Sequence, residues 1–268
     1  MVERKKLVPD HFSEKSIVDC LSKAVIFSGV YQSALSRLAQ QGHQRFYAPN
    51  NDLWIENQDI PLVGFILSGE VLEEKRRTNG RFIIFDSLKD GDIFGEERFI
   101  HQNLKSRHTL RALTKTTTLA FNDPVDILDA LGEMYPVFLK NLALEFVRRN
   151  GQRDVLAMET LMMLVPTRFA LYLLKAASKC PIMIEKSSVL IPRETQPVVA
   201  ARLATSRESV TKVSLIFEQF GLIHRQKGAI SIDDVRALRD IALKGRNLTF
   251  SALQASTEGQ FQGARVQK

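Results

Sequence analysis

Residues Thr195 to Phe220, TQPVVAARLATSRESVTKVSLIFEQF, carry the most specific structural signal in this chain. It predicts two helices joined by a tight turn, because apolar residues recur at helical spacing on both sides of a short polar break. In the second helix, Val210, Val213 and Phe217 follow one another at spacings of three and four residues. This spacing predicts a buried face that packs on a core.

The start of the second predicted helix carries two capping signals. Ser206 can accept a hydrogen bond from an N–H group of the first turn. Thr205 with Glu208 three residues later forms an alternative capping box. Both signals place the beginning of the helix next to the same polar residues.

The exposed face of this helix carries side chains suited to reading DNA. Arg207, Glu208, Thr211 and Lys212 lie at i, i+1, i+4 and i+5, so they project together from the N-terminal half. In a major groove, arginine and lysine donate to guanine, glutamate accepts from the cytosine amino group, and threonine contacts the thymine methyl. The simpler alternative is a solvated face with a Glu208–Lys212 ion pair worth about 0.3–0.5 kcal/mol.

The charge distribution favours the DNA interpretation. The chain has a net charge of +7, yet residues 1–165 hold 21 Lys and Arg against 22 Asp and Glu. Residues 166–245, which contain the two predicted helices, hold 13 against 7. A basic excess on one segment indicates a polyanionic partner such as double-stranded DNA.

The residues after Phe220 predict a β-hairpin. Apolar and basic residues alternate over residues 221–232 around a Lys227-Gly228 turn. Arg225 and Lys227 would then contact phosphates, which position a protein on DNA without reading its sequence. Two helices followed by such a wing indicate a winged helix-turn-helix.

Residues 46–122 have a different pattern, made of short β-rich runs separated by turn signals. Asn79-Gly80 is a two-residue hairpin signal between two of these runs. Many short strands at similar spacing predict an antiparallel barrel or roll. The predicted strands are Leu62–Leu67, Val71–Glu74, Arg81–Ser87, Leu110–Leu113 and Thr117–Phe121.

A long helix is predicted from about Tyr135 to Met163. Its apolar seam, with a glycine in the middle, has spacings of three and four residues: Leu144, Val147, Gly151, Val155, Met158 and Met162. Such a seam can pack on its own domain, but its length favours a helix that dimerises with a second copy.

The order of these elements resembles the cAMP receptor protein/FNR (Crp/Fnr) family of bacterial transcription regulators, over roughly residues 20–244. The resemblance rests on FILSG at residues 65–69, DGDIFGE at residues 90–96, RALT at residues 111–114 and, above all, TSRESVTK at residues 205–212. It implies an α+β protein with an N-terminal cyclic-nucleotide-binding-like antiparallel β-roll, a long dimerisation helix and a C-terminal winged helix-turn-helix. A homodimer would bind a near-palindromic operator through the recognition helix Ser206–Phe220, with half-sites about 34 Å apart.

The resemblance also implies roles for individual residues. By position, Arg207, Glu208 and Lys212 match the base-reading residues of the family, and Thr211 matches a further base contact in some members. An activator of this family would also contact RNA polymerase. A cytoplasmic protein with no membrane association is expected, since the sequence has neither a signal peptide core nor a long apolar run.

The effector site departs from the family pattern. In members that bind cAMP, an acidic residue holds the ribose hydroxyl and an Arg-Ser pair holds the cyclic phosphate. Here Glu96 follows Gly95 as expected, but the pair reads Ser106-Arg107 in reversed order, and Arg153-Asp154 stands near the dimer-helix position. A one-residue slip turns Arg107 to the opposite face of an extended chain. These residues remain the candidate effector site, with cAMP disfavoured and effector-free activity as an alternative.

The sequence gives less support to other cofactors and functions. With two cysteines, Cys20 and Cys180, the chain lacks the four ligands of an iron–sulfur cluster, and no motif supports haem or a metal. No nucleophile–base pair or phosphate-binding loop indicates an enzyme. The second function considered is a cyclic-nucleotide sensor that acts through ligand or protein contacts.

The expected domain order follows from these segments. It comprises an N-terminal extension over residues 1–20, a β-roll over 21–125, helices including the dimer helix over 126–164, the winged domain over 165–245 and a disordered tail over 246–268.

Overall fold

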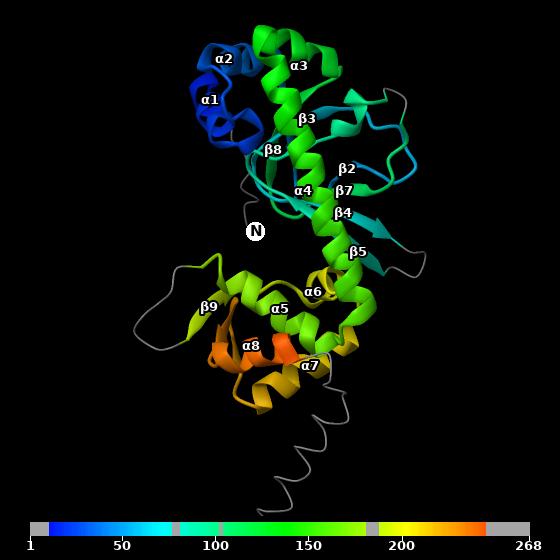
Figure 1. Cartoon of the computed structure of the whole chain (residues 1–268), viewed down its shortest axis with the longest axis vertical. Coiled ribbons are helices and arrows are strands. Elements are labelled where there is room, and N and C mark those ends of the chain that lie inside the picture. Colours follow the sequence, from blue (N-terminus) through cyan, green and yellow to red (C-terminus); the bar gives the residue numbers. More distant parts are fainter. Residues whose placement is uncertain (1–10, 77–80, 102–103, 181–187, 245–268) are drawn as a thin grey trace, which may run out of the picture. The chain divides into compact units, whose positions relative to one another are not determined.

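The computed structural model describes residues 11–76, 81–101, 104–180 and 188–244 (Figure 1). The chain divides into two compact units, Met1–Arg153 and Asp154–Lys268. The Asn79-Gly80 turn, residues 181–187 and the predicted tail lie outside the described residues. The predicted α+β architecture, with an antiparallel roll, a long helix and a helix-turn-helix, is confirmed.

Two four-stranded antiparallel sheets form the roll of the first unit, in the orders β1-β8-β3-β6 and β2-β7-β4-β5. All five predicted strands are present, and β4 pairs with β5 on either side of the predicted hairpin turn. Three further strands, β1, β2 and β6, have no counterpart in the sequence prediction. The strands are β1 (His43–Tyr47), β2 (Asp52–Trp54), β3 (Val63–Ser68), β4 (Val71–Arg76), β5 (Phe82–Leu88), β6 (Ile93–Phe94), β7 (Thr109–Ala112) and β8 (Thr116–Phe121).

Strand β3 is buried on both of its faces, which explains its nearly continuous apolar sequence. Because side chains alternate along a strand, Phe65 and Ile66 enter two different cores. Phe65 packs against helical residues, with its ring 4.9 Å from that of Phe27. Ile66 packs with Trp54 and Phe94 between the two sheets, next to the candidate effector residues.

Helices cover the outer side of the roll. The helices α1 (Glu14–Lys23), α2 (Gln32–Gln41) and α3 (Pro124–Leu131) lie side by side (Figure 1). Short 3₁₀ segments span Val25–Phe27, Glu96–Phe99 and Gly132–Met134. Helix α1 begins inside the segment predicted as an N-terminal extension and buries Ile17 and Val18 in the core.

The long helix α4 spans Tyr135–Met162, within one residue of the predicted end. Its first turns pack on the roll through Phe138 and Leu142, both buried. The helix continues past the boundary between the two units at Arg153. The boundary between these two compact units therefore falls inside α4.

The second unit is a three-stranded antiparallel sheet, in the order β10-β11-β9, with four helices among its described residues. Phe169 and Phe217 lie at the centre of its core, with ring centroids 5.4 Å apart. The predicted wing is confirmed as the β10–β11 hairpin. The elements are α5 (Val165–Ala177), β9 (Val189–Pro192), α6 (Gln196–Arg202), α7 (Arg207–Gln219), β10 (Ile223–Gln226), β11 (Ala229–Ile232) and α8 (Val235–Lys244).

Candidate DNA-binding face and roll pocket

Helix α7 has one buried and one exposed face, as its sequence predicts. Val210, Val213 and Phe217 are at most 1% exposed. The four candidate base-reading residues are all exposed on the N-terminal half of the helix: Arg207, Glu208, Thr211 and Lys212. The fold therefore presents these side chains together to solvent, which is the arrangement that a major-groove reader requires.

The N-terminus of α7 is capped by Ser206, whose Oγ accepts a hydrogen bond from the backbone N–H of Ser209 at 3.1 Å. This is the first of the two predicted capping arrangements. The turn before it includes Ala204, which has a positive φ of 48°. The N–H of Thr205 donates to the carbonyl of Ala200 at 2.9 Å and closes the turn between α6 and α7.

Replacing Ser206 by alanine should lower the free energy of unfolding of the second unit by about 1 kcal/mol, because a helix N–H loses its acceptor. Urea denaturation followed by circular dichroism measures this change. Ser206→Asp is the matched control, because aspartate also caps helices. Wild-type stability in Ser206→Ala would contradict the capping role.

The wing carries the two predicted phosphate-contacting residues in different environments. Lys227 is exposed at the turn, beside Gly228 with its φ of 78°. Arg225 instead forms a bidentate ion pair with Glu218 of α7, including a 2.7 Å contact from Nε to Oε1. The carboxylate of Glu218 also accepts from the backbone N–H of Arg225. This pair fixes the wing against α7, and a phosphate contact by Arg225 stays a prediction.

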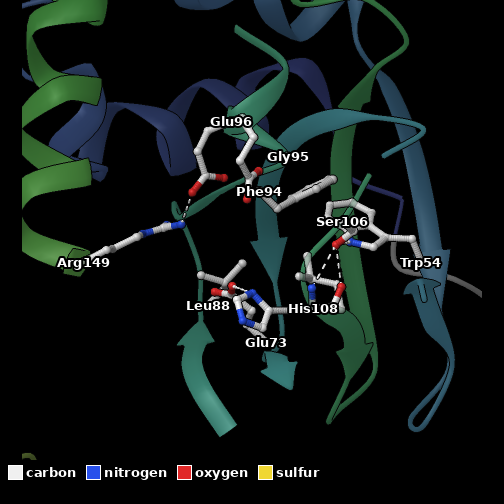
Figure 2. A pocket seen from close by; sticks show the side chains of 11 residues that line it. Trp54, Glu73, Leu88, Phe94, Gly95, Glu96, Ser106, His108 and Arg149 are labelled. Atoms are coloured by element: carbon white, nitrogen blue, oxygen red, sulfur yellow. Dashed lines mark hydrogen bonds and ion pairs between the residues drawn. The ribbon is translucent and has the colours of Figure 1, made fainter. Parts of the chain in front are cut away.

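A second candidate site lies in the roll, where a pocket contains several polar side chains between the two sheets (Figure 2). Gly95 and Glu96 follow β6, and Ser106 and His108 precede β7. Gly95 has a φ of 69°, and a Cβ there would lie 2.1 Å from the carbonyl oxygen of Leu62, so only glycine fits. The lining residues are Trp54, Glu73, Leu88, Phe94, Gly95, Glu96, Glu97, Ser106, His108, Leu110 and Arg149.

Arg149 of α4 reaches into this pocket and is 3% exposed. Its NH1 donates to Oε1 of Glu96 at 2.7 Å, and its NH2 donates to the carbonyl of Ile93 at 3.0 Å. Its Nε donates to Glu145 at 2.8 Å and lies 3.8 Å from a carboxylate oxygen of Asp86. Although burial alone would lower the pKa of Arg149, the surrounding carboxylates raise it.

Glu73 of β4 is the second buried carboxylate and contacts nitrogen atoms of two side chains, Arg153 and His108. NH2 of Arg153 contacts both of its oxygens, at 2.8 and 2.7 Å, and Nδ1 of His108 lies 2.6 Å from Oε1. Burial alone would raise the pKa of Glu73, but the hydrogen bonds from His108 and Arg153 outweigh burial and lower it. Glu73 is therefore held as a carboxylate by its partners.

The candidate effector residues separate into three groups. Gly95, Glu96 and Ser106 line the pocket, where Oγ of Ser106 accepts from Nε1 of Trp54 at 2.8 Å. Arg107 is exposed and does not line the pocket, because neighbouring residues of an extended segment point to opposite faces. Arg153 contacts Glu73 rather than an open space.

Sequence reasoning missed Arg149, Glu73, His108 and Trp54 as pocket residues. The available signal was the helical spacing of α4, in which Arg149 lies one turn before Arg153 and therefore on the same face. The spacing could not identify their carboxylate partners, which lie 53 and 80 residues away in the sequence.

Burial raises the pKa of Glu96 to about 7, from an ordinary value of 4.5, despite the opposing attraction of Arg149. Folding therefore favours the protonated form, so the free energy of unfolding should fall as pH rises from about 4.5 to about 7. Glu96→Gln should reduce this slope and leave the part contributed by Asp92, whose pKa is also raised by burial. Urea denaturation of wild type and variant across this range measures the difference. The pKa of Glu73 is lowered, so this residue changes the free energy of unfolding only at lower pH. The same dependence of unfolding free energy on pH in wild type and Glu96→Gln would therefore contradict the prediction.

The seam of α4 is exposed to solvent along its length in the single chain. Val147 is 71% exposed and Met162 is 63% exposed. A hollow of about 260 Å³ adjoins the C-terminal part of the seam, next to Val155 and Met158. Exposed apolar side chains in one row indicate a face that another surface covers.

In the described residues, no helix has both the length and the apolar character needed to cross a bilayer.

Comparison with known families gives one match in each unit. Residues 44–126 match the cyclic nucleotide-binding domain, and residues 167–241 match the Crp-like helix-turn-helix domain. The chain is also similar to the CRP-like cAMP-activated global transcriptional regulator of two Mycobacterium tuberculosis strains, CDC 1551 and H37Rv. Each is 25% identical over 221 residues, which cover 82% of this chain and 97% of the relative.

Solved structures show the same fold at lower sequence identity. The c-di-GMP responsive global regulator CLP of Xanthomonas campestris aligns with a TM-score of 0.66 and 18% identity, over 75% of this chain and 98% of that chain. A transcriptional regulator of the CRP family from Thermus thermophilus aligns with a TM-score of 0.60 and 20% identity, over 74% and 96% of the two chains. With the two domain matches in the same order along the sequence, the chain belongs to the Crp/Fnr family of transcription regulators.

Proposed function

We propose that this protein regulates transcription by binding, as a homodimer, to a near-palindromic DNA operator. The observation that carries the proposal is the exposed polar face of α7, held above a core of apolar side chains. The output is occupancy of DNA rather than catalysis. Such a protein acts in the cytoplasm and, if it is an activator, contacts RNA polymerase.

Each residue of the α7 face has a role in this proposal. Arg207 donates two hydrogen bonds to guanine O6 and N7, and Glu208 accepts from a cytosine amino group. Thr211 contacts a thymine methyl, and Lys212 reaches guanine or a phosphate. The Oγ1 of Thr211 donates to the carbonyl of Arg207 at 2.9 Å, which satisfies the hydroxyl within the helix and leaves the methyl group for the apolar contact.

Phosphate contacts supply affinity in the proposed complex. Lys227 at the wing is exposed, and Arg225 stands beside it on β10. The backbone N–H groups at the start of α7, next to Ser206, also favour a phosphate because of the helix dipole. The basic excess of residues 166–245 adds a general attraction to DNA.

Dimerisation through the seam of α4 would bring in a second copy of the chain and therefore a second α7 helix. Its apolar side chains, from Leu144 to Met162, follow a heptad-like repeat and are exposed in the single chain. Pairing two such seams buries these side chains and places two α7 helices on successive major grooves. A two-fold symmetric dimer in turn predicts a palindromic operator.

Selection of binding sites from random duplex DNA tests this function. We expect an enriched palindromic consensus and an affinity whose logarithm falls linearly with the logarithm of salt concentration, because bound cations are released from DNA. Enrichment of no sequence over the starting pool would contradict the proposal.

A second candidate is a cyclic-nucleotide sensor that acts through ligand or protein contacts. It is supported by the match to the cyclic nucleotide-binding domain and by the M. tuberculosis relatives, which are named as cAMP-activated. It predicts a saturable rise in melting temperature with cAMP and no sequence-specific DNA binding. The same selection, run with and without cAMP, separates the two functions.

A further inference from the structure

Two arginines of α4 pair with two carboxylates that line the roll pocket, and one of the arginines, Arg149, lines the pocket as well. Arg149 contacts Glu96, and Arg153, one turn later, contacts Glu73 (Figure 2 shows the first pair). Both carboxylates are buried, at 7% and 5% exposure. The pocket therefore has its cationic partners already in place, supplied by the chain itself.

Several ionisable side chains around the pocket are paired with one another. From β5 and α4, Asp86 and Glu145 face Arg149, together with Glu96. From the segment before β7, His108 faces Glu73, with its Nδ1 2.6 Å from the carboxylate. A nucleotide phosphate that took Arg153 would leave the buried carboxylate of Glu73 without that partner, which is strongly unfavourable. A phosphate that took Arg149 would have to replace the contacts of this arginine with Glu96, Glu145 and Ile93.

The space left between these side chains is small. The remaining cavity measures about 10 Å³, room for about one water molecule. Pockets for small organic ligands measure roughly 300–1,000 Å³. Ser106, the one hydroxyl of the reversed pair, is already hydrogen-bonded to Trp54.

The same helix carries the arginines and the seam on different faces. Residues 149 and 153 are four apart and share one face, while the seam position Gly151 lies between them, about 200° around the helix. Contacts of the arginines with the roll therefore fix which face of α4 the seam presents. The rotation and position of α4 are set from inside the roll.

We propose that Arg149 and Arg153 act as a built-in effector: Arg149 occupies the nucleotide pocket, Arg153 pairs with Glu73 of its lining, and together they hold α4 in its DNA-binding arrangement and exclude cyclic nucleotides. This inference rests on the proposed DNA-binding function. It makes the two arginines the residues that determine effector specificity, with Glu96 and Glu73 as their acceptors.

The test is operator affinity of the full-length protein, measured by fluorescence anisotropy at fixed salt, with and without millimolar cAMP, cGMP or cyclic di-GMP. Allosteric effectors typically change affinity about 5–150-fold. We expect tight operator binding without nucleotide and a change of less than about twofold on adding any of the three. Nucleotide-dependent binding within the typical range would overturn the inference, while the DNA-binding function would stand.

Substitution of Arg149 provides a second test of the inference. Arg149→Met should weaken nucleotide-free operator binding at least about fivefold, the lower end of allosteric coupling. Arg148→Met is the matched control, because Arg148 is the neighbouring arginine, has a side chain 48% exposed and shares Glu145 with Arg149 but does not line the pocket. We expect wild-type affinity for this control. Equal affinity in the two variants would overturn the inference.

A double variant distinguishes loss of the Arg149–Glu96 interaction from unfolding of the protein. Glu96→Gln with Arg149→Met removes both ionisable partners together, which proteins tolerate far better than the loss of one partner of a buried pair. Its far-ultraviolet circular dichroism should match wild type, while its nucleotide-free operator affinity falls as in Arg149→Met. A folded double variant with wild-type affinity would contradict the proposal. Absence of operator binding by wild type under all conditions would instead contradict the proposed function.

Discussion

Replacing Arg207 by alanine should weaken operator binding by about 1–3 kcal/mol, or about 5–150-fold, and relax preference at one base pair of each half-site. The reason is the loss of two hydrogen bonds to a guanine edge. Arg207 is exposed at the first position of α7, so the thermal stability of the protein should not change. Binding-site selection with the variant, followed by affinity measurements on single-base operator variants, gives both quantities.

Arg207→Lys separates base reading from a phosphate contact. Lysine keeps the positive charge but lacks the planar fork that holds a guanine edge. If Arg207 reads a base, the lysine variant should recover part of the affinity and little of the preference. Full recovery of both by lysine would assign Arg207 to a phosphate, and unchanged binding by the alanine variant would contradict its role on DNA.

Replacing Val155 by glutamate should convert the dimer to monomers and weaken operator binding by a factor on the order of 10²–10⁴, because the linked second half-site is lost. Val155 is 52% exposed in the single chain and lies in the middle of the seam. Two glutamates facing each other across a two-fold axis would repel and leave charges in an apolar interface. Analytical ultracentrifugation and anisotropy measure the two effects.

Ala157→Glu is the matched control for the seam, because residue 157 is exposed on the same helix but lies about 160° around it from Val155 and well away from the seam. It adds the same charge and should leave both the dimer and the operator affinity unchanged. If Val155→Glu remains dimeric, the seam does not form the interface.

Local signals in the sequence were sufficient for most of the fold. The helix cap at Ser206, the turn at Lys227-Gly228 and the length of α4 each depend on residues close together in the chain. Strand β1 was missed because its sequence, HQRFY, has no apolar run. Strands β2 and β6 were missed because they have only three and two residues. Strand β6 has two residues, and its pairing with β3 depends on a partner almost thirty residues away.

The two candidate sites also differ in how much of each can be predicted from the sequence. The polar face of α7 follows from helical spacing alone, so all of its residues could be named from the sequence. The pocket depends on contacts between distant segments, such as Arg149 with Glu96 and Arg153 with Glu73. Charge pairs of this kind have no periodicity, so Arg153 could be identified only as a candidate, and Arg149 was not identified.

The two faces of α7 have separate consequences for how such a protein diversifies. Its buried face holds the unit together, and a change such as Phe217→Ala would remove about 3–5 kcal/mol of stability. Its exposed side chains take little part in packing, and surface substitutions usually change stability by no more than about 0.5 kcal/mol. A lineage can therefore acquire a new operator through single changes at Arg207, Glu208, Thr211 or Lys212, with the scaffold unaltered at each step.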